Sequence, residues 1–438
     1  MSAQPRPSRE PREHKRAGLN YQRVRDATLA LCATLAPEDT VAQSMPDASP
    51  AKWHLAHTTW FFEQFLLAHF DPGYRRFHEG WDFLFNSYYQ TVGPMHARPQ
   101  RGLLTRPTLR EINAYRAHVD AAMRALLDHR GNDPEVIARV TLGLNHEQQH
   151  QELLLTDIQH LFSLNPLQPA FREVLPAAKM EPVSLRFIAG KQGIAEVGHA
   201  GRNFAYDNET PRHRALLHPH AIANRCVTNA EFLEFIADGG YRNPALWLSE
   251  GWDTVQRERW LHPLYWDDAL ETTFTLGGRR AIETSAPVCH VSFFEADAFA
   301  RWAGARLPTE VEWEVVAQQL PVEGNFADSD ALRPLPSRAQ ADPERPLQMF
   351  GDVWEWTSSP YVGYPGYRPA GGALGEYNGK FMCGQWVLRG GSCATPAGHV
   401  RASYRNFFSP GRAGSSAASG WRGMHETESA SSPRRSSR

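Results

Sequence analysis

The sequence is poor in cysteine and contains no long apolar run. Only five of its 438 residues are cysteines, at positions 32, 226, 289, 383 and 393, and no C-x-x-C pair occurs. Scattered cysteines in odd number argue against a disulfide framework, so we expect a reducing, cytoplasmic location. Because no run of about 18 apolar residues is present, we expect no membrane-spanning helix.

An excess of charge of one sign is also missing. The chain carries 46 basic and 48 acidic side chains, for a net charge of -2. This balance gives no indication of nucleic acid or an anionic membrane as a partner. The first residues, MSAQPRPSREPREHKRAG, lack the apolar segment of a secretory signal, and we expect them to form a disordered basic tail over 1–18.

Helical periodicity dominates the first part of the chain. Apolar spacing predicts helices over 20–36, 49–70, 108–131 and 133–164. Ser49 is the expected N-cap of the second helix, with Pro50 at its first position, and Thr108 with Glu111 forms a capping box for the third. Four helices with one long connection, 71–107, predict a four-helix bundle over 19–170, a fold that holds metal sites between facing helices.

The pattern changes after this bundle. From about residue 180 the sequence shows short strand-like runs, many Gly, Pro and Trp residues, and two helical segments, around 227–240 and 292–319. We expect a loop-rich α+β domain over 180–425. The low-complexity end of the chain predicts a second disordered tail over 426–438.

The run His146-Glu147-Gln148-Gln149-His150 fits the H-E-x-x-H pattern of zinc metalloproteases. On a helix, the two histidines lie one turn apart on one face, which continues to Asp157, so both could bind one cation. A protease would also need a third ligand. A metzincin would have Gly at 153 and His at 156, but the chain has leucine and threonine there, and Glu173 is an isolated candidate. The protease interpretation is therefore weak.

A better third ligand lies in the second helix, in WHLAH, where His54 or His57 could face the long helix. Three neutral imidazoles leave open positions on one side of a metal ion. Zn²⁺ tolerates this arrangement, and so does Fe²⁺, which needs vacant positions for O₂ and a substrate. Spacing does not decide between the two metals or between the two histidines.

Several segments together resemble one enzyme family. SPAKWHLAH, HEQQHQELLLTDIQH, ARLPTEVEWE, GDVWEWTSSPY and VRASYRNFF are similar, in this order, to segments of the ergothioneine-biosynthetic sulfoxide synthases. These are non-haem iron enzymes in which a DinB-like helical bundle precedes a domain like that of formylglycine-generating enzyme. The resemblance runs from about residue 20 to 408.

This resemblance implies the metal ligands. By matching the family's motifs, it selects His57, His146 and His150 as ligands of Fe²⁺, with O₂ as co-substrate. It makes His54 an ordinary helix residue and Glu147 a structural or outer residue. It also implies that Gln149 hydrogen-bonds the histidine-derived substrate.

The resemblance extends to the connection between the second and third helices. Tyr88 and Tyr89 match a tyrosine pair of one branch of the family, in which a phenol can donate a proton or an electron while O₂ is reduced. Arg98 and Arg101 match an R-x-x-R arrangement that binds the carboxylate of the thiol substrate, as a guanidinium fork can.

At the end of the second domain, Asn406 and Phe407 match residues of the pocket for the trimethylated histidine. An aromatic face suits a trimethylammonium group, which has no hydrogen-bond donor. Members selective for a γ-glutamyl donor have an acidic residue after this pair, whereas this chain has Phe408. After Phe408 the sequence departs from the family, and the last strand is expected to be lost or altered.

The implied function is formation of a C–S bond between a cysteine-type thiol, cysteine or γ-glutamylcysteine, and imidazole C2 of hercynine (Nα-trimethylhistidine), with O₂ supplying the sulfoxide oxygen. Two alternatives remain at this point. One is a zinc hydrolase that uses His146, Glu147 and His150. The other is a non-catalytic, metal-stabilised binding module.

Overall fold

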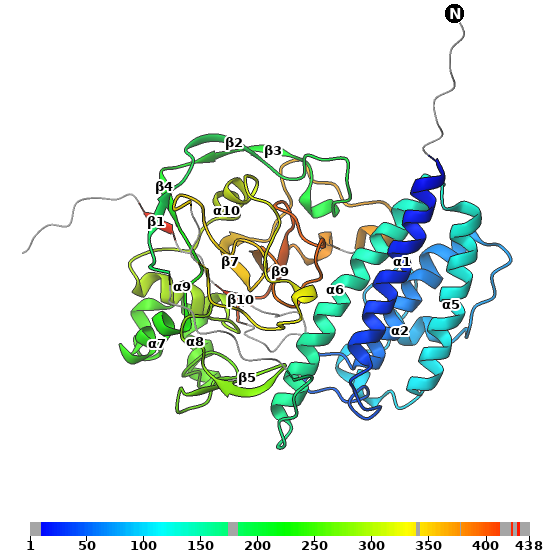
Figure 1. Cartoon of the computed structure of the whole chain (residues 1–438), viewed down its shortest axis with the longest axis horizontal. Coiled ribbons are helices and arrows are strands. Elements are labelled where there is room, and N and C mark those ends of the chain that lie inside the picture. The colour runs from blue at the N-terminus through cyan, green and yellow to red at the C-terminus, as the bar shows by residue number, and fades with distance from the viewer. Residues whose placement is uncertain are drawn as a thin grey trace, which may run out of the picture. The chain divides into compact units, whose positions relative to one another are not determined.

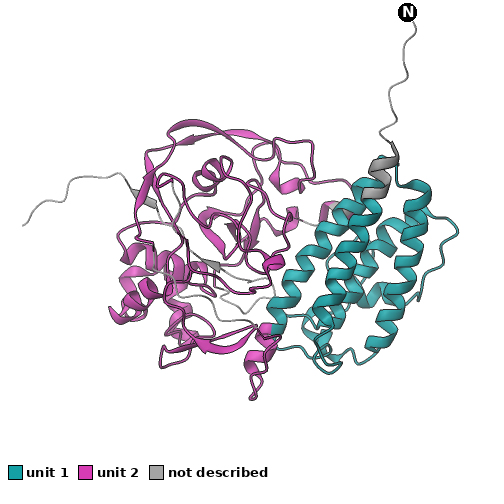
Figure 2. Ribbon diagram, in the orientation of Figure 1, with its two compact units in different colours: residues 1–158 teal, residues 159–438 magenta. Residues whose placement is uncertain are grey.

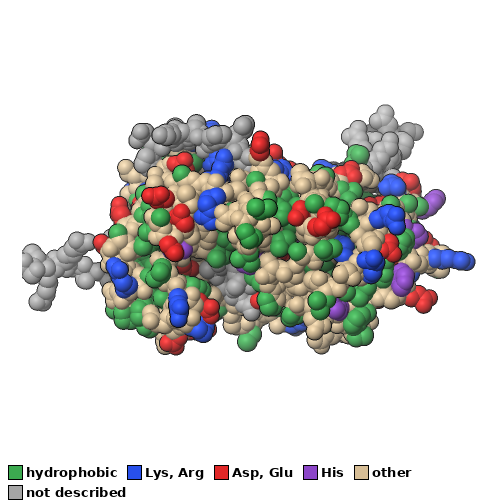
Figure 3. Space-filling view, turned by 90° about the horizontal axis from the view of Figure 1, so that it is seen from below, with side chains coloured by type: hydrophobic (Ala, Val, Ile, Leu, Met, Phe, Trp, Pro, Cys, Tyr) green, Lys and Arg blue, Asp and Glu red, His purple; other side chains and the backbone are tan. Residues whose placement is uncertain are grey.

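The chain is described from a computed structural model that covers residues 10–173, 183–338, 342–376, 378–411, 422–423 and 427–429. It divides into two compact units, Met1–Ile158 and Gln159–Arg438 (Figure 2). None of the helices in these ranges is both long enough and apolar enough to cross a lipid bilayer. On the face shown in Figure 3, acidic and basic side chains are interspersed, as expected from the net charge of -2.

Unit 1 is a helical bundle. Its helices are α1 (Glu10–Cys32), α2 (Ala51–Phe62), α3 (Ala68–Phe70), α4 (Trp81–Phe85), α5 (Leu109–Arg130) and α6 (Pro134–Leu164), the last of which runs on into unit 2. A π-helical turn, Glu63–Leu67, joins α2 to α3, and a 3-10 turn, Arg98–Leu103, precedes α5. Helices α1, α2, α5 and α6 lie side by side (Figure 1). The predicted four-helix bundle is confirmed.

Local sequence signals explain most helix ends. The Thr108 hydroxyl accepts from the Glu111 N–H and the Glu111 carboxylate accepts from the Thr108 N–H, which completes the predicted capping box of α5. The prediction for Ser49 is wrong, because Pro50 is the N-cap residue of α2. The Ser49 N–H instead donates to Asp157 Oδ2 at 2.8 Å, and this tertiary bond replaces the local cap.

Helix α2 is buried on every side, since all of its residues from Ala51 to Phe62 are buried. A helix buried all round can carry polar side chains only where they find partners inside the protein. Any histidine on α2 therefore has to be accounted for by a specific contact.

Unit 2 is a loop-rich α+β domain, as predicted. Its strands are β1 (Phe187–Ala189), β2 (Gly193–Val197), β3 (His213–Leu217), β4 (His220–Ala223), β5 (Thr272–Thr275), β6 (Gly278–Ala281), β7 (Trp354–Pro360), β8 (Trp386–Arg389), β9 (Asn406–Phe408), β10 (Arg422–Gly423) and β11 (Thr427–Ser429). They form sheets in the orders β1-β4-β11 and β10-β7-β8-β9 and the antiparallel pairs β2-β3 and β5-β6.

The helices of unit 2 are α7 (Asn229–Ala237), α8 (Ser249–Glu258), α9 (Phe293–Trp302) and α10 (Glu310–Ala317). Capping boxes begin α7, α9 and α10, within the two segments predicted as helical. Helix α8 was not predicted. It contains Gly251, where a Cβ would lie 2.9 Å from Cγ of Phe294, so tertiary packing and not helix propensity explains this glycine.

Two elements of the structure fall inside the ranges predicted as tails. Helix α1 begins at Glu10, inside the range 1–18. Strand β11 lies inside the range 426–438 and pairs antiparallel with β4, whose other edge is paired with β1. An open strand edge offers backbone hydrogen bonds to any extended segment, which explains why a polar segment can form a strand here. Residues 1–9 and 430–438 lie outside the described residues.

Candidate metal centre

Helices α2 and α6 approach closely at Gly143. A Cβ at this position would lie 2.7 Å from Cε1 of Phe62 and 3.0 Å from Cε1 of Phe61. A larger residue would therefore have to displace the rings of Phe61 and Phe62. Gly143 lies about one turn before His146, so the close packing brings an imidazole of α6 within reach of α2.

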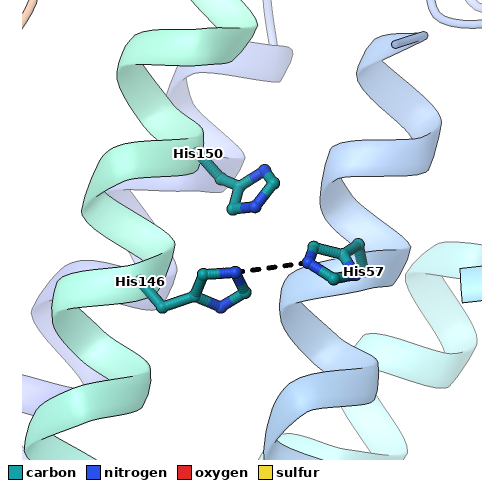
Figure 4. Close-up of side chains that lie close together, drawn as sticks. All are labelled: His57, His146 and His150. Carbon is teal, nitrogen blue, oxygen red and sulfur yellow. Dashed lines mark hydrogen bonds between the residues drawn. The ribbon is translucent and has the colours of Figure 1, made fainter. Parts of the chain in front are cut away.

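Three imidazoles meet in the buried space between these helices. His57 from α2 and His146 and His150 from α6 point toward one another (Figure 4). One ring nitrogen of each residue lies within 4.8 Å of those of the other two. The Nε2 atoms of His57 and His146 are 3.2 Å apart. The structure thus brings together the three residues that the family resemblance selects.

The orientation of the His57 ring is fixed by its second nitrogen. Nδ1 lies 2.6 Å from the carbonyl oxygen of Phe85, at the end of α4. Since a carbonyl only accepts, Nδ1 carries the hydrogen, and the lone pair of the neutral ring is on Nε2, facing His146. Trp53 stacks on the same ring at a centroid distance of 4.6 Å. Donation of the second nitrogen to a carbonyl is usual for metal-binding histidines.

Burial keeps the three rings neutral. The pKa values of His57 and His150 lie well below the ordinary value, first because burial penalises the cation and then because of repulsion from His146. Burial also lowers the pKa of His146 to about 3. Neutral imidazole is the form that binds metals. Three such donors fit a divalent first-row ion and leave coordination positions for other molecules, so the cluster has the chemistry of a metal site.

Glu147 lies between two of these histidines in sequence but is held by cations. Its Oε2 accepts from Arg25 Nη1 at 2.9 Å, and its Oε1 accepts from Arg116 Nη2 at 2.5 Å and from the Thr28 hydroxyl at 2.6 Å. Burial acts to raise the pKa of Glu147, but Arg116 and Arg25 outweigh it and lower the pKa to about 2. A zinc hydrolase needs this carboxylate as a general base, and the geometry does not support that use.

His54 is more than the ordinary helix residue that the family resemblance implies. Its ring joins His150 to Asp157, with 2.8 Å between the two Nδ1 atoms and 3.0 Å between His54 Nε2 and Asp157 Oδ2. All three side chains are buried. His54 lies three residues before His57, and so both face α6. Both histidines between which spacing could not decide therefore lie at the site. His57 is one of the three clustered rings, and His54 contacts His150.

The two predicted arginines differ in their surroundings. Arg98 is exposed, whereas Arg101 is 3% exposed, with its guanidinium carbon 3.3 Å from the centroid of the Trp53 ring. Arg101 donates to the hydroxyls of Ser49 at 2.8 Å and Ser87 at 3.4 Å. Within the described part of unit 1, no carboxylate lies at ion-pair distance from Arg101, and its Nε has no hydrogen-bond partner. Burial accordingly lowers the pKa of Arg101 well below its usual range.

The predicted tyrosine pair lies in the connection that follows α4. Tyr89 is fully buried and packs on Phe65 and Trp60 at centroid distances of 5.0 and 5.8 Å. Tyr88 is half-buried, and its hydroxyl donates to the Tyr89 hydroxyl at 3.4 Å. The two phenol groups are thus in contact through their hydroxyls, and Tyr88 is the more exposed of the two.

The remaining predicted residues belong to two different units. Gln149 is half-buried on α6, next to His150 in sequence. In unit 2, Asn406 and Phe407 lie on β9, where Phe407 stacks on Tyr361 at a centroid distance of 4.0 Å and an interplanar angle of 12°. The strand ends at Phe408.

Two protein-family models match the chain. Residues 20–154 match the DinB superfamily, and residues 175–342 and 346–425 match the sulfatase-modifying factor enzyme 1-like domain. This order agrees with the helical unit followed by the α+β unit. The predicted fold class is therefore confirmed.

Relatives that align with most of the chain show the family to which it belongs. The hercynine oxygenase of Mycolicibacterium smegmatis is 34% identical over 404 residues, which cover 84% of this chain and 89% of the relative. The hercynine oxygenase of Mycobacterium tuberculosis is 35% identical over 394 residues, with the same coverage of both chains. The chain belongs to the hercynine oxygenase family.

A further relative matches a smaller share of the chain. The formylglycine-generating enzyme of Streptomyces coelicolor is 30% identical over 247 residues, or 44% of this chain and 73% of the relative. All five cysteines of the present chain are free thiols; Cys393 is buried and Cys383 is exposed.

Sequence analysis missed the residues around the histidines. The Arg25 and Arg116 contacts to Glu147 join positions 122 and 31 residues apart, and no local pattern announces them. A signal for Asp157 did exist, since it lies seven residues after His150 on the same helix face.

Proposed function

We propose that this chain is a non-haem iron(II), O₂-dependent sulfoxide synthase that joins the sulfur of a cysteine-type thiol to imidazole C2 of hercynine. One observation carries the proposal: three neutral imidazoles converge from two helices near a buried arginine that has no carboxylate at ion-pair distance among the described residues of unit 1. Membership in the hercynine oxygenase family supports the same substrate.

The overall reaction balances. The thiol loses its hydrogen and C2 loses its hydrogen as the C–S bond forms, and O₂ accepts four electrons. One oxygen atom becomes the sulfoxide oxygen and the other leaves as water. When bound by His57, His146 and His150, iron(II) would supply the electron transfer that O₂ reduction requires and would favour the thiolate form of the substrate.

Arg101 is the expected anchor of the thiol substrate. Its buried guanidinium lies near the histidines, since its charge contributes to the lowered pKa values of both His57 and His150. A carboxylate of the substrate would supply the ion-pair partner that Arg101 does not have within the described part of unit 1. Phe408 stands where γ-glutamyl-selective members have an acidic residue, so we propose cysteine as an accepted donor.

The tyrosine pair is proposed to deliver a proton or an electron as O₂ is reduced. Tyr88 donates its hydroxyl hydrogen to Tyr89, so loss of either phenol breaks the pair. We expect Tyr89→Phe to shift the products from C–S coupling toward simple thiol oxidation. Product analysis by mass spectrometry measures this ratio, and an unchanged sulfoxide yield would remove Tyr89 from the mechanism.

Gln149 is proposed to hydrogen-bond the imidazole of hercynine. For unit 2, the family resemblance supports Asn406 and Phe407 as binding residues for a trimethylammonium group. Phe407 offers an aromatic face beside Tyr361, the type of surface that binds quaternary ammonium groups. Phe407→Leu should then raise the KM for hercynine more than the KM for the thiol.

An oxygen-electrode assay tests the function. Purified protein loaded with Fe²⁺ should consume O₂ only when hercynine and cysteine are both present, and should form the sulfoxide conjugate. The Zn²⁺-loaded protein is the control and should be inactive. Peptidase activity with zinc, lost in Glu147→Ala, would favour a hydrolase, whereas hercynine binding without O₂ uptake would favour a binding module.

A further inference from the structure

We infer that Asp157 and His54 form a hydrogen-bond relay that positions His150 to bind the metal through its Nε2 atom. His54 is in this sense a positioning residue, since it acts through His150. The inference rests on the proposed function in one respect only, namely that His57, His146 and His150 hold a metal. It assigns a role to two side chains that the metal cluster itself does not include.

The relay begins at the Asp157 carboxylate. Its Oδ2 lies 2.8 Å from the main-chain nitrogen of Ser49, which can only donate. Oδ2 is therefore an acceptor, and it lies 3.0 Å from His54 Nε2. The hydrogen of the His54 ring must then be on Nε2. Asp157 is 4% exposed and His54 is 1% exposed, so this bond is shielded from water.

The next bond follows from the first. With its hydrogen on Nε2, the His54 ring presents the lone pair of Nδ1, which lies 2.8 Å from Nδ1 of His150. His150 must donate from Nδ1, which leaves its own lone pair on Nε2. The relay thus selects the tautomer of His150 that offers Nε2 to a metal.

The two helices orient their ligands by different means. His57 of α2 donates its second nitrogen to the main-chain carbonyl of Phe85, a contact that a side-chain substitution at 85 would not remove. His150 of α6 depends on a side chain, His54, which in turn depends on Asp157. The orientation of His150 can therefore be removed by a single substitution, which makes the relay testable.

Loss of such an outer partner typically costs about 10- to 100-fold in metal affinity. We expect His54→Leu to weaken Co²⁺ binding by this factor, because leucine offers no acceptor to His150. His54→Gln should recover most of the affinity, because the amide oxygen can accept from His150 while the amide nitrogen donates to Asp157.

Thr156→Val is a matched control on α6. Thr156 neighbours Asp157 in sequence, is 8% exposed, and bonds through its hydroxyl to the Glu152 carbonyl of its own helix. We expect this variant to bind Co²⁺ like the unchanged protein.

The experiment is a Co²⁺ titration of the full-length apoprotein, followed by its d–d absorption, with the folded state of each variant checked by circular dichroism. The expected order of affinity is unchanged protein and Thr156→Val, then His54→Gln, then His54→Leu. A changed d–d spectrum in His54→Leu, restored in His54→Gln, would mark an altered ligand geometry that a general loss of packing does not explain.

The outcomes separate the two proposals. If the unchanged protein binds no Co²⁺, or if His146→Ala binds it equally well, the proposed metal site fails. If the metal site holds but His54→Gln binds as weakly as His54→Leu, or if both bind like the unchanged protein, the relay is refuted. Should His54→Leu not fold, Asp157→Leu takes its place, because it removes the carboxylate that holds the His54 ring. It should weaken Co²⁺ binding relative to Thr156→Val, and equal affinities of these two variants would refute the relay.

Discussion

Buried arginines occur in two contrasting settings within unit 1. Arg25 and Arg116 are 0% and 1% exposed, and Glu147 binds both, with Asp120 as a further partner of Arg25. Arg101 is 3% exposed, donates to two hydroxyls and lies over the Trp53 ring, and no carboxylate among the described residues of unit 1 is at ion-pair distance from it. The same residue type at the same burial is thus charge-paired by the fold in one place and not in the other.

The pKa values express this difference. Although burial acts to lower the pKa of Arg25, Glu147 and the other acidic partners raise it above its ordinary value. The pKa of Arg101 is lowered well below its ordinary value, by burial first and by Arg98 second. We infer that the ion-paired guanidinium of Arg25 stabilises the fold, whereas the guanidinium of Arg101 can bind an anionic ligand. Because Glu147 is the carboxylate that pairs with Arg25 and Arg116, it is not available as the general base that an H-E-x-x-H protease requires.

The largest expected effect tests the paired setting. Glu147→Ala leaves two buried guanidinium groups without their shared carboxylate, and we expect a loss of about 3–5 kcal/mol in the free energy of unfolding. Urea denaturation of the apoprotein measures it. Glu135→Ala is the control on the same helix, because the Glu135 side chain is 59% exposed and pairs with Arg139 at the surface, where about 0–1 kcal/mol is expected. Equal losses in the two variants would contradict the comparison.

The second effect tests the unpaired setting. Arg101→Met keeps an apolar stem and removes the buried charge, so stability should stay the same or rise. The KM for cysteine should increase by about 10- to 100-fold, because a hydrogen bond between charged groups contributes about 1.5–3 kcal/mol. Steady-state O₂ uptake measures the KM. Arg116→Met, equally buried, should show the reverse, namely lower stability with an unchanged KM in the folded protein.

The pH dependence of stability sharpens the comparison further. The folded pKa of Glu147 is about 2, whereas an unperturbed Glu titrates near about 4.3. A lowered carboxyl pKa contributes stability above the unfolded value and loses it as the pH falls from about 5 toward about 2. Glu147→Gln removes this titration, so its stability should decline less over that window. Urea denaturation at several pH values measures both curves, and parallel curves would refute the role of Glu147.

Sequence reasoning predicted those features that depend on local signals. The caps of α5, the start of α6 at Pro134 and the face shared by His146 and His150 all follow from spacing within one or two turns. The choice of His57 came from family resemblance, because helical periodicity places His54 and His57 on the same face. What could not be predicted depends on long-range packing. The bonds from Ser49 and His54 to Asp157 span 108 and 103 residues.

The smallest effect concerns Arg98. It lies three residues before Arg101 on the same 3-10 turn, yet it is exposed, so water already solvates its charge. We expect Arg98→Ala to change the KM for cysteine by less than about threefold, in line with the small contribution of exposed charges. Arg98 repels the Arg101 guanidinium and thereby lowers its pKa. Removal of the Arg98 charge should therefore raise the pKa of Arg101. A KM increase as large as that of Arg101→Met would mean that both arginines bind the carboxylate, and that exposure in the free protein does not separate binding residues from surface residues at this site.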